Sequence, residues 1–199
     1  MKIQILLYNG FDELDAIAPF EVLRMATRHN TELHVEMVAL DGTPEITAQN
    51  GLRIQVHAKL DSSADIVLVP GGGWVARSAQ GAWAEAQHGT IPDALAHVYK
   101  EGKTLAAVCT GAMLLATAGL LRNRNATTHH NAIVELKELG AHLQDARVVD
   151  DGDILTSGGV TSGIDLALWL VERYYGARIA IAIERNLEYE RRGVVWRQS

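Results

Sequence analysis

One stretch, residues 105–114, constrains this chain more than any other, because it combines an apolar strand, a tight turn and a helix. The apolar residues 105–108 precede Cys109, the only cysteine, and such a run is typical of a strand covered on both faces. Gly111 and Ala112 permit a sharp turn, and the residues that follow favour helix. The stretch therefore predicts a nucleophile elbow, in which the turn lifts a reactive side chain, here a thiol, above the sheet.

Cys109 has two interpretations from this local pattern. At the start of a helix, unpaired N–H groups and the helix dipole are expected to favour the thiolate, which is the nucleophilic form. A free cysteine is, however, commonly a small buried hydrophobe. The rest of the chain has to distinguish the two.

Apolar strands alternate with amphipathic helices along the chain. We expect strands at residues 2–8, 33–40, 66–69, 105–108 and 126–128, and strand pairs within 46–56 and 147–156. Helices are expected at residues 14–27, 83–87, 92–100, 111–119, 131–139, 162–175 and 177–189. This alternation predicts a single α/β domain, residues 1–199, with a flavodoxin-like, doubly wound and mainly parallel sheet that has helices on both faces.

Composition narrows the function classes. The formal net charge of −6 argues against a nucleic-acid partner. A single cysteine cannot form an internal disulfide, so a reducing, cytoplasmic location is expected. The first residues are not typical of a signal peptide, and the uncharged run 105–121 is short and interrupted by polar residues and glycines, so no membrane partner is expected.

Three loops that follow predicted strands carry candidate site residues. They are residues 9–14, 70–73 and 109–110, and in an open parallel sheet such loops meet at the carboxyl edge of the strands. Asp12 has the position of a helix N-cap, whereas Asp15, between apolar neighbours, is expected to point inward. A buried carboxyl beside a thiolate is pushed toward its protonated form, so the two groups are expected to share one proton.

Backbone and imidazole groups complete this predicted site. Gly72 and Gly73 can bring N–H groups close to a ligand and, with the N–H of Thr110, form an oxyanion hole; a plain glycine turn is the alternative. His129 is expected to end a short strand in the same crevice and to orient a small-molecule substrate. The adjacent His130 would point away from it and is interpreted as a surface or structural residue, so no metal site is expected.

Several segments together resemble the ThiJ/PfpI superfamily, also called the DJ/PfpI family, whose fold is that of the class I glutamine amidotransferases. These segments are residues 14–15, 19–23, 69–72, 108–111, 126–129 and 158–165. The resemblance favours Cys109 as a reactive thiol and implies no cofactor. Family members are usually homodimers, which implies one here, with the apolar helix around residues 17–25 as a candidate contact surface.

Two positions make the pattern most similar to that of isonitrile hydratases. Thr110 stands where peptidase-like members have histidine, and Asp15 stands where deglycase- and glyoxalase-like members have glutamate. The resemblance implies that the Cys109 thiolate attacks the isonitrile carbon, that Asp15 protonates the adduct, and that water activated by Asp15 then releases an N-substituted formamide. The alternatives are a glyoxalase- or deglycase-like enzyme acting on reactive aldehydes and a non-catalytic redox or ligand sensor. The sensor half of AraC-type regulators is also similar, but no helix-turn-helix region is expected in this sequence.

Overall fold

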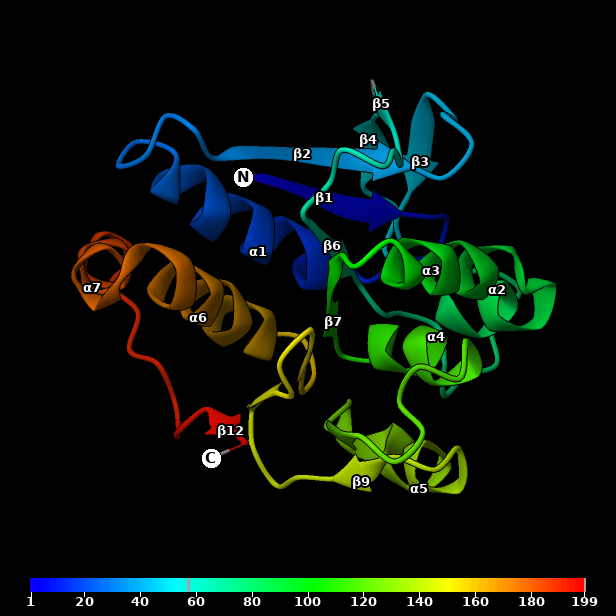
Figure 1. Ribbon diagram of the computed structural model, residues 1–199. Coiled ribbons are helices and arrows are strands. Elements are labelled where there is room, and N and C mark those ends of the chain that lie inside the picture. The colour runs from blue at the N-terminus through cyan, green and yellow to red at the C-terminus, as the bar shows by residue number, and fades with distance from the viewer. Residues whose placement is uncertain (57, 199) are drawn as a thin grey trace.

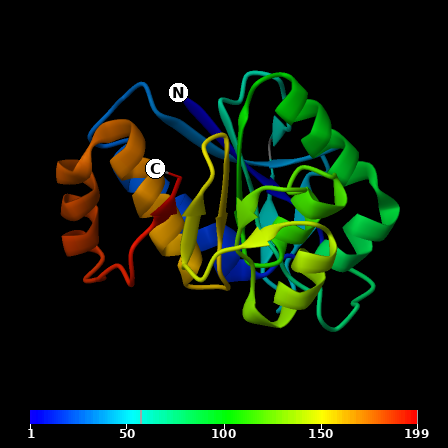
Figure 2. The ribbon, with the colours of Figure 1, turned by 60° about the horizontal axis from the view of Figure 1, so that its bottom comes forward.

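The computed structural model describes residues 1–56 and 58–198, which form a central sheet between two layers of helices (Figures 1 and 2). The strands of the central sheet are β1 (Lys2–Leu7), β2 (His34–Ala39), β5 (Ala58–Lys59), β6 (Ile66–Val69), β7 (Thr104–Val108), β10 (Val148–Asp150), β11 (Ile154–Ser157) and β12 (Trp196–Arg197). Two smaller sheets pair β3 (Glu45–Thr47) with β4 (Arg53–Gln55) and β8 (Asn125–Ala126) with β9 (His142–Leu143). The helices are α1 (Glu13–Ala26), α2 (Ala82–His88), α3 (Thr90–Lys100), α4 (Gly111–Thr117), α5 (Ile133–Glu138), α6 (Ser162–Tyr175) and α7 (Ala177–Asn186), and a 3-10 turn, His130–Ala132, precedes α5.

The order of strands identifies the topology. The central sheet runs β12-β10-β11-β7-β6-β1-β2-β5. The pair β10–β11 is antiparallel, and the other pairings in this sheet are parallel. The parallel strands β2-β1-β6-β7-β11, numbered by their place in the chain, follow the order 2-1-3-4-5 of flavodoxin-like doubly wound folds. The predicted fold class is therefore confirmed.

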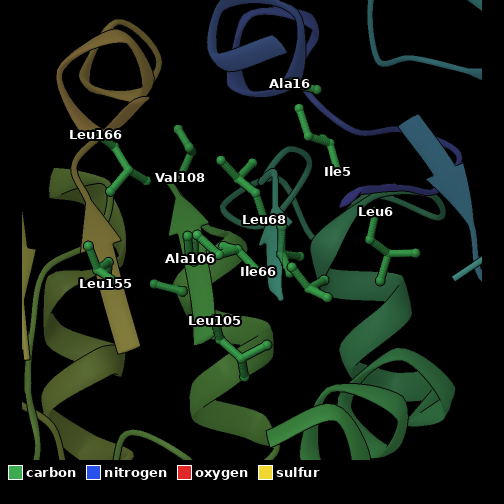
Figure 3. Close-up of a cluster of buried hydrophobic side chains, with 14 of the residues drawn as sticks. Ile5, Leu6, Ala16, Ile66, Leu68, Leu105, Ala106, Val108, Leu155 and Leu166 are labelled. Carbon is green, nitrogen blue, oxygen red and sulfur yellow. The ribbon is translucent and has the colours of Figure 1, made fainter. Parts of the chain in front are cut away.

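Helices cover both faces of the sheet. Helices α1, α6 and α7 lie on one side, and α2, α3 and α4 lie on the other (Figure 1). In Figure 3, Val108 points toward the side of Ala16 and Leu166, whereas Leu105 of the same strand points the opposite way. These side chains are 0% exposed, and burial of an aliphatic side chain contributes roughly 1.5–3 kcal/mol. The sheet is thus buried on both faces, and the loops at its ends remain available for a site.

The structure differs from the sequence prediction mainly in short elements. The predicted strand pairs are confirmed as the antiparallel pairs β3–β4 and β10–β11. Strands β5, β9 and β12 were not predicted, because each has only two residues, too few to show a strand pattern. The predicted helix 131–139 is divided into the 3-10 turn and α5, and the last predicted helix ends at Asn186. Among the described residues, no helix combines the length and apolar character that a membrane span requires.

Candidate active site

Cys109 occupies the sharp turn between β7 and α4. Its backbone φ is +57°, in the left-handed region that residues other than glycine rarely adopt. The N–H of Cys109 donates to the carbonyl oxygens of Ser157 and Gly158 at 3.1 and 3.0 Å, and the Thr128 hydroxyl donates to the Cys109 carbonyl at 2.9 Å. These bonds hold a conformation that costs about 1–3 kcal/mol. The turn has the geometry expected of a nucleophile elbow.

Two glycines let the loop after β6 approach this turn closely. A Cβ atom at Gly111 would lie 2.8 Å from the carbonyl oxygen of Pro70, and one at Gly71 would lie 2.5 Å from the backbone nitrogen of Thr110. Both distances are too short for a side chain. The loop after β6 therefore packs backbone against backbone on the residues that follow Cys109.

A cavity of about 240 Å³ opens above this turn. It is lined by Asp12, Gln49, Gly72, Gly73, Trp74, Val75, Ala76, Cys109, Thr110, His129, Asn131 and Val160. The loops after β1, β6 and β7 all contribute to this lining, so their predicted convergence is confirmed. Cys109 is 6% exposed, which leaves its thiol within reach of a small molecule in the cavity.

Asp15, on α1, is buried behind the thiol. Its side chain is 0% exposed and does not line the cavity, so the prediction that it points inward is confirmed. The N–H of Gly71 donates to Asp15 Oδ2 at 3.0 Å, whereas Oδ1 has no hydrogen-bond partner within the described part of the chain. Burial raises the pKa of Asp15 to about 7, and the charge of Asp12 acts in the same direction.

The thiol of Cys109 is also shifted toward its protonated form. Burial and the nearby charge of Asp15 raise the pKa of Cys109 well above its usual range, and backbone N–H groups of Thr110 and Val160 only partly oppose this shift. The predicted lowering of the thiol pKa by a helix start is therefore wrong for the free protein. Helix α4 has only seven residues, and desolvation of the sulfur outweighs its dipole. Since two negative charges are disfavoured here, the Asp15–Cys109 pair keeps at least one proton at neutral pH, and Asp15 is close to half protonated there.

The N–H groups of the glycine loop already have acceptors. Gly72 donates to Thr110 Oγ1 and Gly73 donates to Gln49 Oε1, each at 3.0 Å. Gly72 and Gly73 line the cavity as predicted, but they do not present a preformed oxyanion hole. The N–H groups that act on the sulfur are those of Thr110 and Val160.

His129 lines the cavity as a neutral donor. The N–H of Asn131 donates to His129 Nδ1 at 3.3 Å, so the proton of the neutral ring is on Nε2. Burial and then His130 lower the pKa of His129. The two imidazole centroids are 4.2 Å apart, so the prediction that His130 points away from His129 is wrong. The short strand predicted to end at His129 ends at Ala126 instead. Within residues 1–56 and 58–198, no three histidine, cysteine or acidic side chains group as metal ligands.

The apolar wall of the cavity is fixed by a clamp between the loop after β6 and α5. Trp74 Nε1 donates to Glu135 Oε2 at 2.7 Å, and Arg77 Nη2 pairs with Glu135 Oε1 at 2.9 Å. The Arg77 guanidinium also lies 3.7 Å from the centroid of the Trp83 ring, and Trp83 meets Trp74 edge-on. These contacts hold the segment that carries Val75.

Sequence reasoning missed several cavity residues, among them Gln49, Asn131 and Val160. Gln49 comes from the β3–β4 hairpin, which was predicted, but its docking against the glycine loop depends on tertiary contacts. Asn131 lines the cavity and also orients His129 through its backbone N–H. Val160 has a φ of +47°, which is rare for a β-branched residue. Its position after Gly158 and Gly159 was the one available signal of unusual backbone.

Comparisons with known proteins agree with this geometry. The sequence model of the DJ-1/PfpI family matches residues 1–173. The chain is 32% identical over 191 residues to isonitrile hydratase from Pseudomonas putida, covering 95% of this chain and 78% of that protein. It is also 32% identical to the HTH-type transcriptional regulator GbdR from Pseudomonas aeruginosa, covering 96% of this chain but 51% of the regulator, about half its length. A crystal structure of a ThiJ/PfpI family protein from Pseudomonas syringae matches with a TM-score of 0.84 and 26% identity, covering 96% of this chain and 76% of that one. The chain belongs to the DJ-1/PfpI family.

Proposed function

We propose that this protein is a cofactor-independent, cysteine-dependent hydratase that converts isonitriles to N-substituted formamides. The observation that carries the proposal is the Asp15–Cys109 pair, a thiol and a buried carboxyl group that keep at least one proton at neutral pH next to a small cavity. Similarity to isonitrile hydratase from Pseudomonas putida over 95% of the chain supports the choice of substrate class.

The pair supplies what the first half of the reaction requires. The sulfur of Cys109 forms a bond to the terminal isonitrile carbon, and the proton held by the pair moves to that carbon, so Asp15 is left as a carboxylate. The product is a thioimidate on Cys109, in which carbon is bonded to sulfur, hydrogen and nitrogen. Water then displaces the sulfur and releases the formamide, so that one difficult addition becomes two easier steps.

Three residues that line the cavity support these steps, namely Thr110, His129 and Val160. The N–H groups of Thr110 and Val160 stabilise negative charge on the sulfur when it attacks and when it leaves. Nε2–H of the neutral His129 ring is available to the substrate nitrogen. The apolar wall of Trp74 and Val75 suits an uncharged nitrogen substituent.

The test is turnover of an isonitrile by the native protein and by Cys109→Ala and Asp15→Asn. We expect formamide from the native protein, none above background from Cys109→Ala, and a loss of about 100- to 10,000-fold for Asp15→Asn, which is the usual size of general acid–base effects. Glu21→Gln, an exposed carboxylate on the same helix, is the matched control and should keep native activity.

Parallel assays with methylglyoxal and peroxide distinguish the two alternatives. Lactate from methylglyoxal, without formamide from the isonitrile, would assign the site to the glyoxalase-like alternative. Absence of turnover together with clean oxidation of Cys109 would favour a sensor, which is the alternative suggested by the similarity to a transcriptional regulator.

A further inference from the structure

The position of Asp15 leaves the second half of the proposed reaction without an obvious base. Water that hydrolyses the thioimidate has to enter from the cavity, but Asp15 is 0% exposed and does not line it. An adduct on Cys109 extends into the cavity, which Asp15 does not line. A base for this water is therefore expected on the cavity side of the sulfur.

Asp12 is the carboxylate on that side. It lines the cavity together with Cys109 and His129, and no other acidic residue or any lysine or arginine among the described residues does so. The N–H of Leu14 donates to Asp12 Oδ1 at 3.1 Å. This hydrogen bond does not involve Oδ2, the second oxygen of the carboxylate. Burial raises the pKa of Asp12, opposed in part by the Leu14 N–H and by His129. Asp12 is thus a half-buried carboxylate that can exchange a proton.

We propose that Asp12 is a catalytic residue of the hydrolytic half-reaction, acting on the water that attacks the thioimidate; this inference rests on the proposed function. Asp12 accepts one proton as the water oxygen bonds to the thioimidate carbon, and returns that proton to the substrate nitrogen, whose C=N bond becomes a single bond. The hydroxyl proton of this adduct then passes to the Asp15–Cys109 pair as the carbon–sulfur bond breaks. Formamide leaves, and the pair again holds one proton.

The same residue also caps α1, and the test has to separate the two roles. Asp12 was expected to be an N-cap, and its hydrogen bond with Leu14 confirms this. Asparagine and serine are N-caps about as good as aspartate. Asp12→Asn and Asp12→Ser therefore keep the cap while removing the base.

The experiment mixes n-butyl isonitrile with the native protein, Asp12→Asn, Asp12→Ser and Glu13→Gln, and follows the intact mass and the formamide in rapidly quenched samples. Glu13 is the adjacent carboxylate, which accepts from the backbone N–H of Asn50 at 2.7 Å and does not line the cavity. We expect both Asp12 variants to form the Cys109 adduct within about 3-fold of the native rate, to accumulate it, and to release formamide at least about 100-fold more slowly. Glu13→Gln should show no accumulation.

Two results would overturn the inference while leaving the proposed function standing. One is formamide release at the native rate by both Asp12 variants. The other is loss of adduct formation and formamide release together in variants that melt within about 2 °C of the native protein, which would place Asp12 in the first step. Absence of formamide from the native protein would instead overturn the proposed function, and this inference with it.

Discussion

At the scale of single residues, the carboxyl group of Asp15 opposes the stability of the fold when it ionises. It is buried with one oxygen lacking a partner among the described residues, so its charged form is poorly solvated. The pKa of Asp15 is raised from 3.8 to about 7 in the folded chain. Between these two values the folded protein binds more protons than the unfolded chain, so the free energy of unfolding decreases as the pH rises through this window.

We expect the free energy of unfolding of the native protein to fall by up to roughly 4 kcal/mol between pH 4 and pH 7 because of this group, since one pKa unit corresponds to about 1.36 kcal/mol. Asp15→Asn cannot ionise and should lose most of this decrease. Urea denaturation at pH 4.5, 6 and 8 measures the difference between the two proteins. Parallel stability profiles would contradict a raised pKa for Asp15.

At the scale of elements, the segment after β6 depends on α5 for its position. Glu135 of α5 accepts a hydrogen bond from Trp74 and pairs with Arg77. Among the described residues, its carboxylate makes no other hydrogen bond or ion pair. Arg77 is exposed and Glu135 is partly buried, so solvent screens the ion pair, and its contribution is at most about 1 kcal/mol. Such a contact matters more for the shape of the cavity wall than for the stability of the fold.

We expect Glu135→Gln to raise the KM for an apolar isonitrile by about 3- to 5-fold, because about 1 kcal/mol of ordering in the wall is lost, and to leave kcat within about 2-fold. Steady-state kinetics measures both constants. Glu138→Gln, an exposed carboxylate of the same helix, is the control. A fall in kcat with an unchanged KM would show that Glu135 acts on the chemistry and not on the wall.

The fold and part of the site could be predicted from the sequence. The topology rule for parallel sheets was sufficient to bring Asp12, Gly72 and Cys109 to one edge, and apolar neighbours were sufficient to place Asp15 inside. The acceptor of the Gly73 N–H lies on a hairpin whose docking no local pattern encodes. The direction of the thiol pKa shift depends on how far folding buries the sulfur. The dipole of a short helix, which is all that the sequence indicates, does not give that degree of burial.

At the scale of the whole molecule, one edge of the site presents apolar side chains to solvent. Leu14 at the start of α1 and Leu52 beside the β3–β4 hairpin are 47% and 44% exposed. Hydrogen bonds between Glu13 and Asn50 hold the two segments together. We propose that a second copy of the chain covers this surface, which would also narrow the cavity, because Asp12 and Gln49 adjoin it.

We expect the native protein to be a dimer in light scattering and Leu14→Glu to be a monomer with unchanged circular dichroism, because a charge in an apolar contact cannot be desolvated without cost. Val134→Glu is the control, since Val134 on α5 is 68% exposed at a different surface. A monomeric native protein, or a dimeric Leu14→Glu variant, would exclude this surface as the interface.

The burial of Asp15 next to Cys109 determines which group of the pair a ligand contacts. A compound that fills the cavity can contact the sulfur but not the carboxyl group, which does not line the cavity. Selectivity in such an arrangement begins with the ability to bond to sulfur, and the fit of the remaining groups refines the choice afterward.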